Sequence, residues 1–78
     1  MKERTPEVLG LEILLQCRGQ GKRLEEITKK VYGNMYEKNM VRVFRILEIL
    51  MQEDVVVPCF MNKCLRFKMN GDPLNHMR

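Results

Sequence analysis

Residues 39–58, "NMVRVFRILEILMQEDVVVP", contain the change of hydrophobic period that decides the fold. The apolar residues first recur every three or four positions, which is the spacing of an amphipathic helix, and this predicts a helix over about 36–52. The β-branched residues 55–57 then begin a strand, which Pro58 confines to a sheet edge or interrupts with a bulge. The buried stripe of the helix is expected to comprise Met40, Val43, Phe44, Leu47, Leu50 and Met51.

Two shorter helices are predicted before this one. Thr5 is a candidate N-cap and Pro6 suits the first helical position, so a helix is expected over about 6–18. A second helix follows through Leu24, Ile27 and Val31, and it ends at a glycine and an asparagine, at positions 33 and 34.

A second strand is predicted after residue 63. Leu65, Phe67 and Met69 alternate with Arg66 and Lys68, which gives the strand one apolar face turned inward and one basic face turned outward. The segment "MNK", residues 61–63, would close a hairpin with the strand at 55–57. The chain is therefore expected to be one domain over 1–78, with an ordered core at about 6–70 and a flexible tail at 71–78.

This order of elements resembles the winged helix-turn-helix fold of small transcriptional regulators. The resemblance is carried by "LEEITKKVYGN" (24–34), by "NMVRVFRILEILMQEDVVVP" (39–58) and by "NKCLRFKM" (62–69). It implies an α+β fold, with three helices followed by a two-stranded hairpin called the wing. It also implies sequence-specific binding of double-stranded DNA as a transcriptional regulator, with recognition helix 36–52 in the major groove and wing 55–70 on the phosphates.

The distribution of charge favours the same partner. Lys and Arg total 14 against 10 Asp and Glu, a net charge of +4. Basic residues occupy the first half of the 36–52 helix and acids its end, which is opposite to the order that the helix dipole prefers. Arg and Asn can also pair with guanine and adenine edges. The candidate DNA-binding residues are Tyr36, Lys38, Asn39, Arg42 and Arg45 in the helix and Lys63, Arg66 and Lys68 in the wing.

Each of these features has a simpler interpretation. A basic helix face is usually only solvated, and Tyr36 could close the turn against the core rather than donate to a phosphate. The alternative function is a winged-helix module that binds proteins within a larger assembly, without direct DNA readout. An enzyme is not expected, because a chain this short encloses little space and its only histidine, His76, stands in the tail without a nucleophile motif.

The three cysteines are an odd number, which fits a reducing compartment and free thiols. Cys59 and Cys64 have the spacing C-x₄-C, which supplies only part of a tetrahedral metal site, so they are interpreted as apolar filler, with a redox or metal role as the alternative. No cofactor or metal is expected. The sequence contains no run of eighteen apolar residues, so we expect no membrane span and a cytoplasmic, nucleoid-associated location.

The first helix is apolar on two sides, and a small core covers only one of them. We expect a homodimer in which Leu9, Ile13 and Cys17 contact a second copy, with Ile49 beside them. The alternative is that the N-terminal arm and the tail around Leu74 cover this surface.

Overall fold

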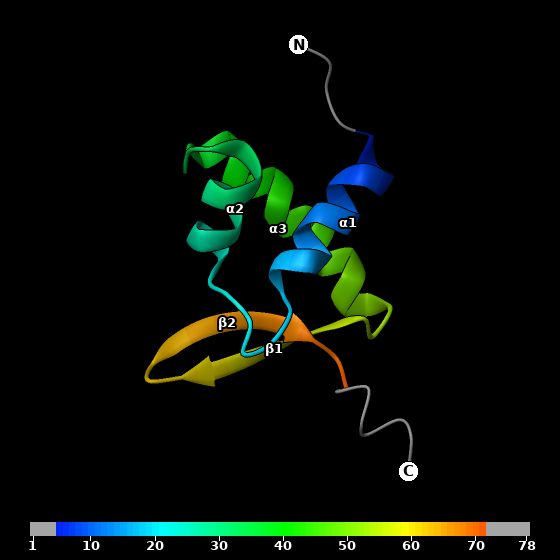
Figure 1. Cartoon of the computed structure of the whole chain (residues 1–78), viewed down its shortest axis with the longest axis vertical. Helices are drawn as coiled ribbons and strands as arrows, with labels where there is room; N and C mark the ends of the chain where they lie inside the picture. Colours follow the sequence, from blue (N-terminus) through cyan, green and yellow to red (C-terminus); the bar gives the residue numbers. More distant parts are fainter. Residues whose placement is uncertain (1–4, 72–78) are drawn as a thin grey trace.

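The computed structural model describes residues 5–71, and it is an α+β domain of three helices followed by an antiparallel hairpin (Figure 1). This coarse prediction is confirmed. Residues 72–78 of the predicted tail at 71–78, with His76 among them, lie outside the described residues. The elements are α1 (Pro6–Gln16), α2 (Leu24–Tyr32), α3 (Glu37–Gln52), β1 (Val56–Met61) and β2 (Cys64–Met69).

The helix ends follow the predicted signals. The Thr5 hydroxyl accepts a hydrogen bond from the Val8 amide at 3.2 Å, and Pro6 opens α1 as expected. α1 ends at Gln16, before the predicted residue 18, because the Cys17 amide turns back to the Leu14 carbonyl at 2.9 Å. α2 ends where Gly33 adopts a φ of 81°, a conformation that glycine reaches without strain.

The hairpin differs in detail from the prediction. β1 runs straight through Pro58 to Met61, so the predicted alternative of a bulge is wrong and the edge-strand alternative holds. Met61 pairs with Cys64, which leaves Asn62 and Lys63 as the loop. Both loop residues have positive φ, as a tight hairpin turn of the primed type requires, although neither is glycine.

One part of the sheet was not predicted. Lys22, in the loop between α1 and α2, forms a bridge with Phe67 through two backbone hydrogen bonds of 3.1 and 2.8 Å. The neighbouring Gly21 has a φ of 83°, and a Cβ placed there would lie 2.6 Å from the Phe67 carbonyl oxygen. The loop therefore covers the outer edge of β2, and β1 is left as the open edge.

The core lies between the three helices and one end of the hairpin (Figure 1). The rings of Phe44 and Phe67 meet edge to face at a centroid distance of 6.4 Å, which joins α3 to β2. The fully or almost fully buried apolar residues are Leu9, Ile13, Cys17, Ile27, Val31, Val43, Leu47, Val56 and Phe67.

This core overturns most of the predicted dimer surface. Leu9, Ile13 and Cys17 are buried within the single chain and cannot contact a second copy. The other apolar side of α1, formed by Val8, Leu11 and Leu15, is the exposed one. Of the predicted interface, only Ile49 lies on the surface, half exposed on α3.

Candidate nucleic-acid interface

The outer surface of α3 carries three exposed cations, Lys38, Arg42 and Arg45, which we call the basic face. None of the ion pairs formed within residues 5–71 involves them. Lys38 and Arg42 are four residues apart and Arg42 and Arg45 three apart, so each pair adjoins on the helix surface. Such like-charged neighbours destabilise a helix by about 0.2–0.5 kcal/mol per pair, a cost that an anionic partner would reverse.

Asn39 is not part of this face. It is 6 % exposed, and its amide nitrogen donates to the Asn34 side-chain oxygen at 2.8 Å. The same oxygen accepts the Tyr36 amide at 3.1 Å, so this contact fixes the turn between α2 and α3. The prediction that Asn39 reads bases is therefore wrong, because its amide is used inside the protein.

Tyr36 precedes α3, and its side chain is 63 % exposed. This exposure contradicts the alternative that the ring closes the turn against the core. The exposed ring thus stands at the N-terminal end of α3, two residues before the first cation of the basic face.

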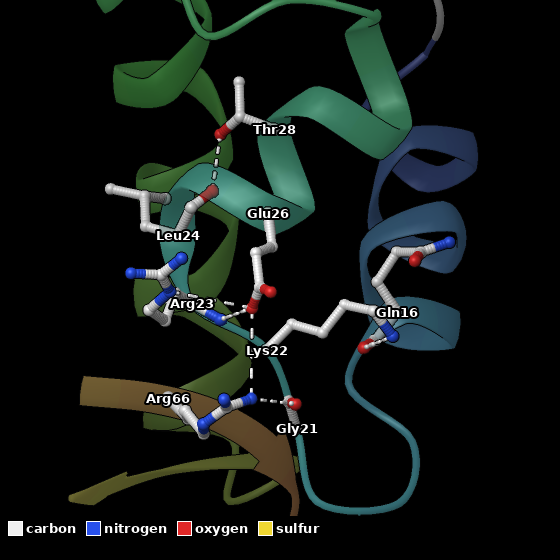
Figure 2. Close-up of polar contacts among 8 residues, drawn as sticks. All are labelled: Gln16, Gly21, Lys22, Arg23, Leu24, Glu26, Thr28 and Arg66. Carbon is white, nitrogen blue, oxygen red and sulfur yellow. Dashed lines mark hydrogen bonds and ion pairs between the residues drawn. The ribbon is translucent and has the colours of Figure 1, made fainter. Parts of the chain in front are cut away.

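The three basic residues of the wing have different surroundings. Lys63 is exposed in the hairpin turn, and Lys68 is partly exposed on β2. Arg66 instead donates to the Gly21 carbonyl oxygen at 3.0 Å, and its guanidinium lies 3.9 Å from the Glu26 carboxylate (Figure 2). Arg66 thus ties β2 to the start of α2, which the alternating pattern of β2 did not indicate.

The Glu26 carboxylate contacts both Arg23 and Arg66. It accepts the Arg23 amide at 3.0 Å, and this hydrogen bond, with the charges of Arg23, Arg66 and Lys22, lowers its pKa below the usual value (Figure 2). Lys22 reaches across the loop to the Gln16 carbonyl oxygen at 3.4 Å. The basic residues here therefore have structural partners, unlike those of the basic face.

The inward face of β2 is shorter than predicted. Only Phe67 is buried, while Leu65 and Met69 are 38 % and 39 % exposed. Opposite Leu65 on β1, Phe60 is 76 % exposed. The alternating pattern could not indicate this, because a residue's position along a strand does not show where the helices that cover the sheet end.

All three cysteines lie within residues 5–71 and are free thiols. Cys17 is buried, and burial raises its pKa to about 11, so it stays protonated at neutral pH. Cys59 and Cys64 are unpaired and partly buried in the hairpin. Within residues 5–71, no group of three or more His, Cys, Asp and Glu side chains is placed to hold a metal ion.

Two shallow grooves flank α3. One, of about 340 Å³, borders the basic face and is lined by Leu24, Glu37, Met40, Val41, Phe44, Arg45 and Glu48. The other, of about 560 Å³, separates α1 from α3 and has an apolar floor with an acid at each side. It is lined by Pro6, Glu7, Gly10, Leu11, Leu14, Ile46, Ile49, Leu50 and Glu53, and we call it the α1–α3 groove.

Comparison with protein families, curated proteins and solved structures gives no match for this chain. None of the helices within residues 5–71 has the length and apolar character needed to cross a membrane. A functional proposal for this chain therefore rests on the contacts, exposure and charge of its own residues.

Proposed function

We propose that this chain is a winged-helix protein that binds double-stranded DNA sequence-specifically and regulates transcription. The observation that carries the proposal is the basic face of α3, whose cations are exposed, unpaired within residues 5–71 and grouped within the first nine residues of the helix. An α-helix fits the major groove, and an arginine there can pair with a guanine through two hydrogen bonds.

The turn before α3 supports the same proposal. α2 and α3 are joined by residues 33–36, a short turn containing a glycine, as in helix-turn-helix motifs. The hydrogen bond between the Asn39 and Asn34 side chains fixes the start of α3. The first basic side chains of the helix are therefore attached to a well-held turn of backbone. In the proposed complex Arg42 and Arg45 read bases, and Tyr36 and Lys38 contact phosphates.

The wing supplies further phosphate contacts in this proposal. Lys63 and Lys68 are accessible, and no acidic residue occurs from Val55 to Gly71. Arg66 has the lesser role, since its guanidinium already binds Gly21 and Glu26.

A protein-interaction module is the second candidate, and the α1–α3 groove favours it. Its apolar floor is accessible, with Leu11 63 % and Ile49 50 % exposed. In the leading proposal the same groove has another role: a second copy docks there, so that a two-fold dimer presents two α3 helices to neighbouring half-sites. The homodimer of the sequence-based prediction is thus kept, on the opposite side of α1.

Arg42→Ala tests the DNA proposal. Loss of a base contact should weaken binding to a selected duplex by about 1–3 kcal/mol and binding to a scrambled duplex much less. Lys68→Ala is the comparison variant, because a phosphate contact contributes equally to both duplexes. Fluorescence anisotropy with the two duplexes measures both effects. If Arg42→Ala keeps the full preference for the selected duplex, α3 does not read bases through Arg42.

A further inference from the structure

Phe60 is the most exposed of the large hydrophobic side chains within residues 5–71. It lies directly opposite Leu65 in the register, so the two side chains share one face of the hairpin. Side chains alternate along a strand, so Val56 and Phe67 lie on the same face. The helices cover that face at Val56 and Phe67 and leave it open at Phe60 and Leu65.

The open end of this face projects from the molecule. Figure 1 shows the turn end of the hairpin extending past α2, away from the other helices. The turn is held tightly, because Asn62 and Lys63 both have positive φ and Met61 pairs with Cys64 directly. Phe60 is thus presented on a short, ordered support rather than on a loose loop.

The charge around Phe60 points to an anionic partner with an apolar interior. Lys63 lies in the turn close to Phe60, Lys68 lies on the other face of the hairpin, and the hairpin contains no acid. Covering an exposed phenylalanine side chain is favourable, because it removes apolar surface from water. DNA offers both features, since its charged backbone encloses stacked bases with apolar faces.

Building on the proposed function, we propose that Phe60, backed by Leu65, inserts between base pairs of the bound duplex as a wedge and bends the DNA. Apolar side chains in such positions unstack one base step at a cost of a few kcal/mol, and pyrimidine–purine steps yield most easily. Lys63, in the turn close to Phe60, contacts an adjacent phosphate. The wing then favours flexible steps such as TA.

An anionic membrane surface is the weaker explanation of the same residues. One aromatic side chain with one partly exposed leucine buries little area, and a single lysine in the turn adds only a weak attraction to such a surface. Stable attachment to lipid needs more than this hairpin offers.

The wedge is tested with a short duplex of repeated TA steps in which 2-aminopurine replaces the central adenines. Its fluorescence rises when the probe base is unstacked. The parent chain should bind this duplex at low salt and raise the fluorescence several-fold. Phe60→Ala should bind within about tenfold of the parent, because phosphate contacts dominate affinity, yet lose the rise. Phe60→Leu, which keeps an apolar wedge, should retain most of it.

Val8→Ala is the matched control, since Val8 is another exposed apolar residue and lies near the start of α1, outside the α1–α3 groove. It should keep the full fluorescence rise. Phe60 is largely exposed, so thermal unfolding of Phe60→Ala should match that of the parent and exclude misfolding.

Any other outcome of this fluorescence test contradicts the proposed insertion of Phe60. If the parent binds the duplex without a rise, or if Phe60→Ala keeps the rise, the wedge is wrong and DNA binding stands. If the parent binds no duplex at low salt, the proposed function and the wedge fail together. Phe60-dependent binding to vesicles of anionic phospholipid, without binding to the duplex, would replace both with a membrane contact.

Discussion

Single residues fix how the parts of this domain meet, and Gly21 is the clearest example. Its positive φ lets the loop after α1 approach β2, where Lys22 pairs with Phe67. A side chain at this position meets the Phe67 carbonyl oxygen, and so no other residue type fits without movement. The loop, the strand and the Arg66 contact to the Gly21 carbonyl depend on this approach.

Gly21→Ala should therefore destabilise the chain more than Gly19→Ala. Both glycines have positive φ, 83° and 69°, but a Cβ at Gly19 meets nothing within 4 Å. We expect about 1 kcal/mol of strain for Gly19→Ala and at least about 1 kcal/mol more for Gly21→Ala, from the clash. Urea unfolding of the two variants measures the difference. Equal midpoints would show that the loop does not hold its close approach in solution.

The sequence predicted some residue roles and missed others for physical reasons. Lys38, Arg42 and Arg45 follow from helical period alone, because their positions oppose the apolar stripe. The predicted DNA contacts of Asn39 and Arg66 did not account for their hydrogen bonds to Asn34 and Gly21. These bonds depend on the path of loops, which the hydrophobic period of a helix or strand does not predict.

At the scale of elements, the caps and periods located all three helices and the hairpin. What they could not decide was which side of α1 faces the core, because this helix is apolar on two sides. Strong amphipathicity settled that choice for α2 and α3, where the buried residues Ile27, Val31, Val43 and Leu47 fall on the predicted stripes. Orientation is therefore predictable only where one face is clearly polar.

The tie between α2 and β2 predicts a pH dependence. The folded-state pKa of Glu26 lies below its ordinary value of 4.5, so its stabilising contribution is complete above about pH 4.5 and is lost as the pH falls through the folded pKa. Glu26→Gln should be less stable than the parent at pH 7, and the difference should shrink toward pH 3. Urea unfolding at the two pH values measures it.

Glu25→Gln is the control for this experiment. It removes a charge from the same turn of α2 without removing the hydrogen bond from the Arg23 amide to Glu26. The role assigned to Glu26 would be contradicted if both substitutions lowered the free energy of unfolding equally. It would also be contradicted if the loss caused by Glu26→Gln did not change with pH.

For the whole molecule, the proposed arrangement places DNA contacts and self-association next to each other on α3. Ile46 and Ile49 line the α1–α3 groove and lie four residues after Arg42 and Arg45, so the basic face borders the groove. In the proposed dimer, two copies that dock through the groove would span half-sites roughly 34 Å apart.

Leu11→Glu should convert this dimer to a monomer. The substitution puts a charge on the apolar floor of the groove, next to the acids Glu7 and Glu53, and Leu11 is exposed enough for the fold to survive. Met35→Glu, at an exposed residue outside the groove, should leave the dimer intact. Sedimentation equilibrium gives the masses. A monomeric parent, or a Leu11→Glu variant with unchanged mass, would contradict the dimer.

The most direct test of the central proposal is the affinity of the parent chain for two duplexes, one selected from a random library and one scrambled. At physiological salt, the selected duplex should bind at least about 10³-fold more tightly, and both affinities should fall steeply as salt rises. Equal affinity for the two duplexes would contradict sequence-specific readout by α3, and no measurable binding to either at low salt would contradict a DNA-binding function altogether.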